Sequence, residues 1–327
     1  MTRRWPGSIG RLGVVEAVAV AALMIEAAIG WPDALYRRIG HPVGLFAWLI
    51  NALEQRWNSP IRSEAVRRVA GVALVALLIG LVGGAAWLIE AAVRAVLGRW
   101  AWLLLALLAV PGLAQRSLYD HVVPVARALT AGDLLAARTA VSRIVGRDTA
   151  TLDKSGVSRA AIESLAESFC DGVAAPLFWL LIVGLPGIWV YKALNTADSL
   201  IGHREPRWRA FGWAAARADD VANWVPARLA GLVLCLAAGW GRALPTMLRD
   251  AHRHASPNAG WPEAAMAGAL GLRLAGPMVY DGVAHAKPWI GDRRREAGAG
   301  DIDRALGLYW RACALLWLIA GGCAWVL

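Results

Sequence analysis

The uncharged stretch that decides the fold is VAGVALVALLIGLVGGAAWLI, residues 69–89. A helix rises about 1.5 Å per residue, so roughly 20 apolar residues cross a hydrocarbon core of about 30 Å. No Asp, Glu, Lys or Arg interrupts this stretch. It therefore predicts a membrane-spanning helix.

The composition of the 327-residue chain points to the same class of protein. Hydrophobic residues make up 58% of the chain and charged residues 18%, whereas soluble domains average about 45–50% and about 25%. The 18 tryptophans suit membrane interfaces. In such a chain, a net charge of +10 indicates loops that meet anionic lipid headgroups or phosphorylated substrates, not nucleic acid. Disordered chains, disulfide scaffolds and small soluble modules are excluded.

Further apolar runs extend this pattern along the chain. Residues 305–327 resemble 69–89 in length, and 100–114 form a shorter run. Residues 12–30 follow three arginines as a signal peptide would. They carry two glutamates and lack a clear cleavage site, so we interpret them as a retained anchor.

Two other runs are poorly suited to a simple crossing. Residues 173–191 are broken by Pro176, Gly184, Pro186 and Gly187, and residues 229–241 are only 13 long. If both crossed the membrane, the polar motifs around them would face opposite sides. We therefore expect half-spanning or re-entrant helices that enclose a polar cavity.

The predicted fold is an all-α, polytopic integral membrane protein with broken or re-entrant helices around a polar site. It forms a single membrane domain over residues 1–327, with about four to six spans and a motif-bearing core at about 115–280. No sustained strand alternation is present. No pair of the four cysteines has CxxC spacing, so neither zinc, an iron–sulfur cluster nor a disulfide framework is expected.

Polar motifs concentrate between residues 142 and 263, and each has a plain structural alternative. Charged residues recur at every fourth position at Arg159, Glu163, Glu167 and Asp171. On a helix they form one stripe. The stripe suits a divalent cation or an ordinary solvated face. Lys192, Asn195 and Ser199 share a helical face with Asp198 beside it, which suits phosphate or amide recognition or a polar cap on a juxtamembrane lysine.

The third motif, RADDVANWVPAR at 217–228, is the most demanding physically. Asp219, Asp220 and Asn223 offer hard oxygen ligands around one turn, which suits a magnesium–phosphate site. Unpaired carboxylates beside an apolar segment cost several kcal/mol, so a functional role is favoured. A fourth motif, NAGWPE at 258–263, precedes an Ala/Gly-rich helix expected over 264–277 and is also compatible with a simple helix start.

These motifs together resemble one family. The runs IVGRDT (144–149), YKALNTADS (191–199), FGWAAAR (211–217), DDVANWVPAR (219–228) and NAGWPE (258–263) closely resemble the CbiB/CobD family of membrane proteins in cobalamin biosynthesis, of the adenosylcobinamide-phosphate synthase type. His41-Pro42-Val43 looks like the family's N-terminal signature. Ser168 stands where the family usually has Asn, and Glu26 stands where it usually has Asp.

The resemblance implies a ligation. The family joins a propionate carboxylate of adenosylcobyric acid to the amine of (R)-1-amino-2-propanol or its O-phosphate, using ATP and Mg²⁺. It also implies the bilayer and other cobalamin-assembly enzymes as partners, in the cytoplasmic (inner) membrane of a bacterium. The site is expected to face the cytosol, where ATP is found.

Roles follow from side-chain chemistry within that reaction, because arginines neutralise phosphate charge and carboxylates hold magnesium or accept protons. The predicted metal ligands are Glu163, Glu167, Asp219, Asp220 and Asn223. The predicted substrate- and phosphate-binding residues are Arg143, Arg147, Thr149, Lys192, Asn195, Ser199, Arg217, Arg228 and Asn258. The predicted acceptors of the amine proton are Asp148, Asp198 and Glu263.

Two other classes of function remain compatible with the sequence. One is a non-enzymatic membrane sensor or regulator like the related AmpE group. The other is a corrinoid-binding membrane scaffold or transporter, although the chain lacks the paired inverted halves that many transporters show.

Overall fold

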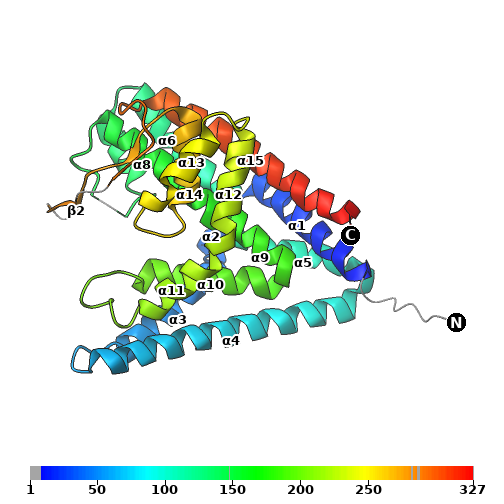
Figure 1. The fold of residues 1–327 in the computed structure, drawn as a ribbon. Coiled ribbons are helices and arrows are strands. Elements are labelled where there is room, and N and C mark those ends of the chain that lie inside the picture. Colours follow the sequence, from blue (N-terminus) through cyan, green and yellow to red (C-terminus); the bar gives the residue numbers. More distant parts are fainter. Residues whose placement is uncertain (1–8, 147, 281–282, 286–287, 327) are drawn as a thin grey trace. The chain divides into compact units, whose positions relative to one another are not determined.

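The computed structural model describes residues 9–146, 148–280, 283–285 and 288–326 (Figure 1). Regular structure in these residues is almost entirely helical, which confirms the all-α prediction. The chain divides into two compact units. Unit 1 comprises Met1–Ala114, Ala175–Ala222 and Ile319–Leu327, and unit 2 comprises Gln115–Ala174 and Asn223–Leu318.

The described part of unit 1 consists of helices and short helical turns. They are α1 (Ile9–Ile29), α2 (Asp33–Ile39), α3 (Pro42–Trp57), α4 (Glu64–Leu97), η1 (Gly98–Trp100), α5 (Ala101–Ala109), η2 (Val110–Gly112), α9 (Ala175–Val183), α10 (Leu185–Ile201) and α11 (Trp213–Ala222). The helix α4 packs against α10 and α11, and α1 packs against α5 and α9.

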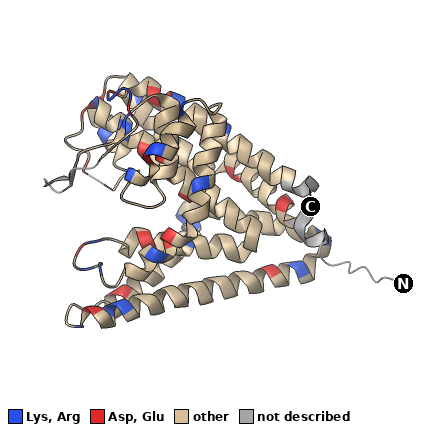
Figure 2. Cartoon of the chain, viewed as in Figure 1, with Lys and Arg blue, Asp and Glu red and all other residues tan. Residues whose placement is uncertain are grey.

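The long helix α4 contains the stretch at 69–89 and extends beyond it at both ends. Ser63 Oγ accepts a hydrogen bond from Val66 N and so caps the first turn. Figure 2 shows charged residues at the two ends of α4 and none along its middle. Its 34 residues reach about 51 Å, enough to cross a bilayer with both charged ends in water.

The run at 173–191 is broken, as its glycines and prolines predict. α9 ends at Val183 and α10 begins at Leu185, with Gly184 between them at φ +75°. Glu90 at the far end of α4 accepts a hydrogen bond from Leu185 N at 2.9 Å. Further along, a Cβ at Gly83 would lie 3.2 Å from Val190. These two approaches show that α10 runs antiparallel to α4.

A buried polar network ties the start of α4 to α3 and to the loop after α10. Asn58 donates to Glu54 at 2.9 Å and accepts from Arg67 Nε at 2.6 Å. Arg207 completes the network with an ion pair to Glu54 at 3.1 Å. Because Glu54 and Asn58 are buried, these bonds satisfy groups that would otherwise be costly. They hold the loop at 203–210 beside the first turn of α4.

Among the residues that the structure describes, unit 2 contains the remaining helices and the strands. They are α6 (Gln115–Thr130), α7 (Leu134–Val141), α8 (Lys154–Phe169), the π-helical turn η3 (Cys170–Ala174), α12 (Trp224–Ala237), α13 (Ala243–Asp250), η4 (Ala251–Arg253), α14 (Gly260–Leu270) and most of α15 (Ala299–Val326). The pair Gly132-Asp133 before an apolar-periodic run predicts a helix start, and Asp133 Oδ1 caps α7 by accepting from Ala136 N at 2.9 Å.

The helices α12, α13 and α14 meet at glycines. A Cβ at Gly231 would lie 2.7 Å from Met247 Sδ, and one at Gly268 would lie 2.7 Å from the carbonyl oxygen of Arg242. An Ala/Gly-rich sequence suits close helix contact, and such contact is present here. The expected helix extent of 264–277 is wrong, because α14 ends at Leu270 with Gly271 in the left-handed conformation at φ +65°.

The residues after α14 form short antiparallel strands that the sequence did not predict. They are β1 (Leu274–Ala275), β2 (Met278–Tyr280), β3 (Val283–His285) and β4 (Trp289–Ile290). β1 pairs with β4, and β2 pairs with β3. Strands of two or three residues are too short for a period-two pattern to appear in the sequence.

Three runs among the described residues are long and apolar enough to cross a membrane: Glu64–Thr130, Lys154–Val183 and Ala299–Gly322. α11 and α12 qualify only together, as a bent pair. This gives three or four candidate spans, against the four to six expected, and confirms a polytopic membrane protein. The single-domain assignment over residues 1–327 stays a prediction.

Candidate functional site

Seven predicted site residues lie on two packed helices of unit 1, α10 and α11. They are Lys192, Asn195, Asp198, Ser199, Arg217, Asp219 and Asp220. Asn195 Nδ2 donates to Asp219 Oδ1 at 3.3 Å. Arg217 forms an ion pair with Asp220 at 3.1 Å. The structure therefore brings the second and third sequence motifs together.

The helix α10 brings the polar side chains of the second motif onto one face, as their spacing predicts. Lys192, Asn195 and Ser199 are spaced along one face of α10. Asp198 lies at the end of the helix, where a side chain at Gly202 would collide with its carboxylate. Asp219 is 9% exposed, so its contact with the Asn195 amide meets part of the hydrogen-bonding need of a buried carboxylate.

His41 joins this region although sequence reasoning attached no chemistry to it. It caps α3, where its Nδ1 accepts from Val43 N at 3.2 Å. Burial lowers the pKa of His41, and the nearby Lys192 charge lowers it further. The imidazole is therefore neutral at pH 7, with its remaining proton on Nε2. Only the tertiary packing of α3 on α10 reveals this neighbour.

Arg228 in unit 2 lies between two indole rings. Its guanidinium carbon is 4.2 Å from the Trp224 ring centroid and 4.7 Å from that of Trp261. It also lies 3.5 Å from the Asn258 amide oxygen. Trp224 precedes Arg228 by one helical turn, so this contact is visible in the sequence spacing. Trp261 comes from α14 and is not.

Glu263 is buried in the first turn of α14 and faces a histidine. Its Oε1 lies 3.6 Å from His254 Nε2, and His254 Nδ1 accepts a hydrogen bond from Ser256 N at 3.0 Å. The spacing of His254 from His252 fits no single helical face, which predicts a surface position for His254. That assignment is wrong, since the chain between η4 and α14 folds back and half-buries the ring.

The residues of the predicted stripe that lie on α8 differ in their burial and in their contacts. Glu163 is buried, and its Oε1 accepts from Ala275 N at 2.8 Å. Glu167 is exposed, while the guanidinium carbon of Arg159 lies 5.4 Å from the Trp289 ring centroid. The alternative of an ordinary solvated helix face is therefore excluded at Glu163, because its carboxylate is buried and holds β1 through the bond to Ala275 N. Neither this contact nor the others test its predicted role as a metal ligand.

The remaining predicted residues of unit 2 lie in separate places. Thr149 is buried and donates to Arg138 O at 3.3 Å. Asp148 and Arg143 are exposed, and Asp148 Oδ1 accepts from Ala150 N. Asn223 is 2% exposed, and its Oδ1 lies 3.8 Å from Cys170 Sγ in η3. Arg147 lies outside the described residues.

No group of three or more His, Cys, Asp or Glu side chains suited to a metal occurs among the described residues. A catalytic magnesium ion commonly uses one or two carboxylates and completes its shell with phosphate oxygens and water. The hard oxygens of Asp219 and Asp220 fit that donor set. Magnesium at these residues stays a prediction.

Comparison with known proteins identifies the family. The family model described as CobD/Cbib protein matches residues 19–309. The chain belongs to the CobD/CbiB family. "Cobalamin biosynthesis protein CobD" of Rhodobacter capsulatus is 50% identical over 307 residues, which cover 93% of this chain and 96% of the relative. No solved structure matches the chain.

More distant members of the family align over nearly the same length. A protein of the same name from a Sinorhizobium species is 47% identical over 91% of this chain and 95% of its own. Another from Brucella suis biovar 1 is 45% identical over 90% of this chain and 92% of its own. The similarity therefore covers both units.

Proposed function

We propose that the protein is an ATP-dependent ligase of cobalamin biosynthesis. It joins a propionate carboxylate of adenosylcobyric acid to the amine of (R)-1-amino-2-propanol or its O-phosphate. Family membership and the relatives' names support the pathway. The single observation that favours ligation is the cluster on α10 and α11, where Asp219 pairs with the Asn195 amide and the adjacent Asp220 pairs with Arg217.

The chemistry requires activation of a poor acyl donor. A carboxylate oxygen attacks the terminal phosphorus of ATP, which gives an acyl phosphate and releases ADP. The amine nitrogen then attacks the acyl carbon, the C–O bond to phosphate breaks, and a base accepts the amine proton. Magnesium, when bound, neutralises charge on the transferring phosphoryl group.

The residues of unit 1 suit the phosphate half of this reaction. Asp219 and Asp220 supply carboxylates for magnesium, while Lys192 and Arg217 supply positive charge for phosphate oxygens. Asn195 holds Asp219 in place. In unit 2, the indole rings restrict the Arg228 guanidinium for an anionic substrate group. Glu263 is a candidate acceptor for the amine proton, with His254 beside it.

Ligation by the purified chain tests the proposal directly. The full chain in detergent is incubated with adenosylcobyric acid, Mg-ATP and either aminopropanol or its phosphate, and the amide product is measured by mass spectrometry. Product with either amine supports the proposal and identifies the preferred substrate. Absence of product with both amines contradicts it, and retained corrinoid binding would then favour a scaffold or transporter.

Replacement of Asp220 tests the assignment of the cluster. Asp220→Asn keeps the size of the side chain and is expected to lower kcat at least 100-fold, because a magnesium ligand is lost. Asp120→Asn is the matched control: Asp120 also pairs with an arginine, at 2.9 Å, and is half-exposed. Near-normal turnover of the Asp220 variant would refute its metal role without refuting ligation.

A further inference from the structure

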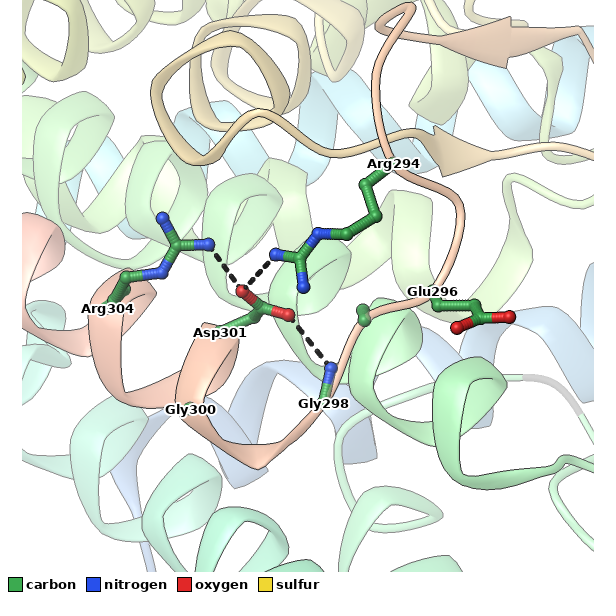
Figure 3. Close-up of a pocket in the computed structure, with 7 residues that line it drawn as sticks. Arg294, Glu296, Gly298, Gly300, Asp301 and Arg304 are labelled. Carbon is green, nitrogen blue, oxygen red and sulfur yellow. Dashed lines mark hydrogen bonds and ion pairs between the residues drawn. The ribbon is translucent and has the colours of Figure 1, made fainter.

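A pocket of about 620 Å³ lies at the start of α15 in unit 2 (Figure 3). Its lining includes Arg294, Arg304, Asp301 and the backbone of Gly298 and Gly300. None of these residues belongs to the predicted site. The pocket is therefore a feature that the proposed ligation does not explain.

Two guanidinium groups converge on one carboxylate oxygen in this pocket. Arg294 Nη2 lies 2.8 Å from Asp301 Oδ1, and Arg304 contacts the same oxygen. The side chain of Asp301 is only 7% exposed, whereas the arginines are 53% and 51% exposed. The trio carries one excess positive charge. Each guanidinium has five N–H donors, so donors remain on both half-exposed groups.

The backbone at the start of α15 also favours an anion, and the other carboxylate of the lining is that of Glu296. The second oxygen of Asp301 accepts from Gly298 N at 3.0 Å, which fixes the first turn of α15. N–H groups in a helix's first turn lack helical partners and attract negative charge. A Cβ added at Gly298 or Gly300 would meet no atom within 4 Å, so the backbone borders open space. Figure 3 shows the Glu296 carboxylate directed away from both arginines.

We propose that this pocket binds a phosphoryl group. The planar guanidinium fork matches the oxygens of phosphate, and a singly charged excess suits a phosphate ester. The pocket opens at the first turn of the candidate span Ala299–Gly322, where headgroup phosphates of anionic lipids are found. The phosphoryl group therefore comes from such a lipid or from a soluble phosphate. The inference does not depend on the ligase activity.

Three variants are designed to change anion binding in the pocket without destabilising the fold. Arg294→Gln removes one guanidinium, whose side chain bonds only to Asp301 among the described contacts. Gly300→Asp adds a negative charge where the structure has open space, and an aspartate in a helix's first turn is stabilising. Gly300→Asn is the matched neutral control. All three are made in the full chain and purified in an uncharged detergent.

Binding is measured as the rise in thermal unfolding midpoint with added inorganic phosphate, dihexanoyl phosphatidylglycerol or, as an acyl-chain control, dihexanoyl phosphatidylcholine. At least one anionic probe is expected to stabilise the wild type and Gly300→Asn. The half-saturating concentration is expected to be about tenfold higher in Arg294→Gln and Gly300→Asp. A response to phosphate identifies a soluble ligand, and a response to phosphatidylglycerol alone identifies a lipid.

Three results would overturn the proposal. One is that neither anionic probe stabilises the wild type. Another is that all four proteins share one half-saturating concentration, which would place the binding elsewhere on the molecule. The last is that Gly300→Asn weakens binding as much as Gly300→Asp, because the effect would then come from bulk and not from charge.

Discussion

At the scale of single residues, Asp250 makes more stabilising contacts than its position at the end of the short helix α13 suggests. Its side chain has no exposed surface and is paired with Arg249 at 2.7 Å. It also accepts from Gly291 N at 2.9 Å. The bond to Arg249 lowers the pKa of Asp250. The carboxylate therefore holds the chain that follows β4 against α13.

Removal of this carboxylate should destabilise the protein. Asp250→Ala is expected to lower the free energy of unfolding by about 2–3 kcal/mol, because Gly291 N is left buried without its acceptor. Asp292→Ala removes the other partner of Arg249, which is 54% exposed, and should cost less than about 1 kcal/mol. Chemical denaturation of both variants in detergent measures the difference. Equal losses would contradict the assignment.

The same residue sets a pH dependence. A carboxylate with a lowered native pKa contributes stability above its unfolded pKa of about 3.9, and the contribution is lost as pH falls through the native value. The gap between wild type and Asp250→Ala should therefore be constant from about pH 6 to 8 and shrink below about pH 4. A gap that widens in acid would show that the native pKa is raised.

Local residue patterns were predictable, whereas partners distant in sequence were not. The Asp133 cap and the shared face of Lys192, Asn195 and Ser199 follow from spacing alone. The bond from Ala275 N to Glu163 joins residues 112 positions apart, and no local period encodes it. Ala275 has φ +56°, a conformation that only the surrounding fold determines.

At the scale of elements, the glycines of α14 decide how closely it packs on α13. Gly268→Ala would place a Cβ 2.7 Å from the Arg242 carbonyl oxygen and from Thr246 Cβ. A backbone oxygen cannot move aside cheaply, so we expect a loss of about 1–3 kcal/mol. Gly307→Ala in α15 is the matched control, since its Cβ meets nothing within 4 Å.

The control is expected to change stability in the opposite direction. Alanine in an open helical position gains up to about 1 kcal/mol over glycine. Unfolding midpoints of the two variants should therefore move apart, with Gly268→Ala below the wild type and Gly307→Ala at or above it. A Gly268 variant as stable as the wild type would mean that α13 and α14 do not pack this closely.

The ends of the helices could be predicted only where a single sequence feature marked them. Residues 69–89 lie within α4, and the break near Gly184 coincides with a glycine at positive φ. The end of α14 was misplaced because alanine and glycine at 264–277 favour tight helix contact without marking where the helix stops. Gly271 is the actual cap. Several glycines in one run make the cap hard to distinguish from a packing position.

At the scale of the whole molecule, the fold of unit 1 shows how basic residues are distributed between the two ends of α4, which bears on its orientation in the membrane. The sequence alone left this open, because basic residues flank both ends of residues 12–30. Ion pairs from Arg207 to Glu54 and from Arg209 to Glu64 place the loop after α10 beside the start of α4. Seven arginines gather at that end: Arg56, Arg62, Arg67, Arg68, Arg204, Arg207 and Arg209. The other end of α4 has Arg94 and Arg99.

The excess of arginines at one end predicts the orientation of α4, because basic loops stay in the cytosol. Since α10 runs antiparallel to α4, its second half, with Lys192 and Ser199, lies towards the arginine-rich end and is expected to face the cytosol. That is the side on which ATP is present. Ile61→Cys, at a position 95% exposed, should react with a membrane-impermeant maleimide only in inverted vesicles. Val96→Cys, at a position 81% exposed, should react in intact cells.

Labelling of the wild type measures the background from the native cysteines, of which Cys170 and Cys235 are buried. The reverse pattern would place the α10–α11 cluster away from ATP and would count against the proposed ligase. Labelling of both cysteines from one side would mean that α4 does not cross the membrane. The expected pattern would establish that the arginine-rich end of unit 1, and the aspartates near it, face the cytosol.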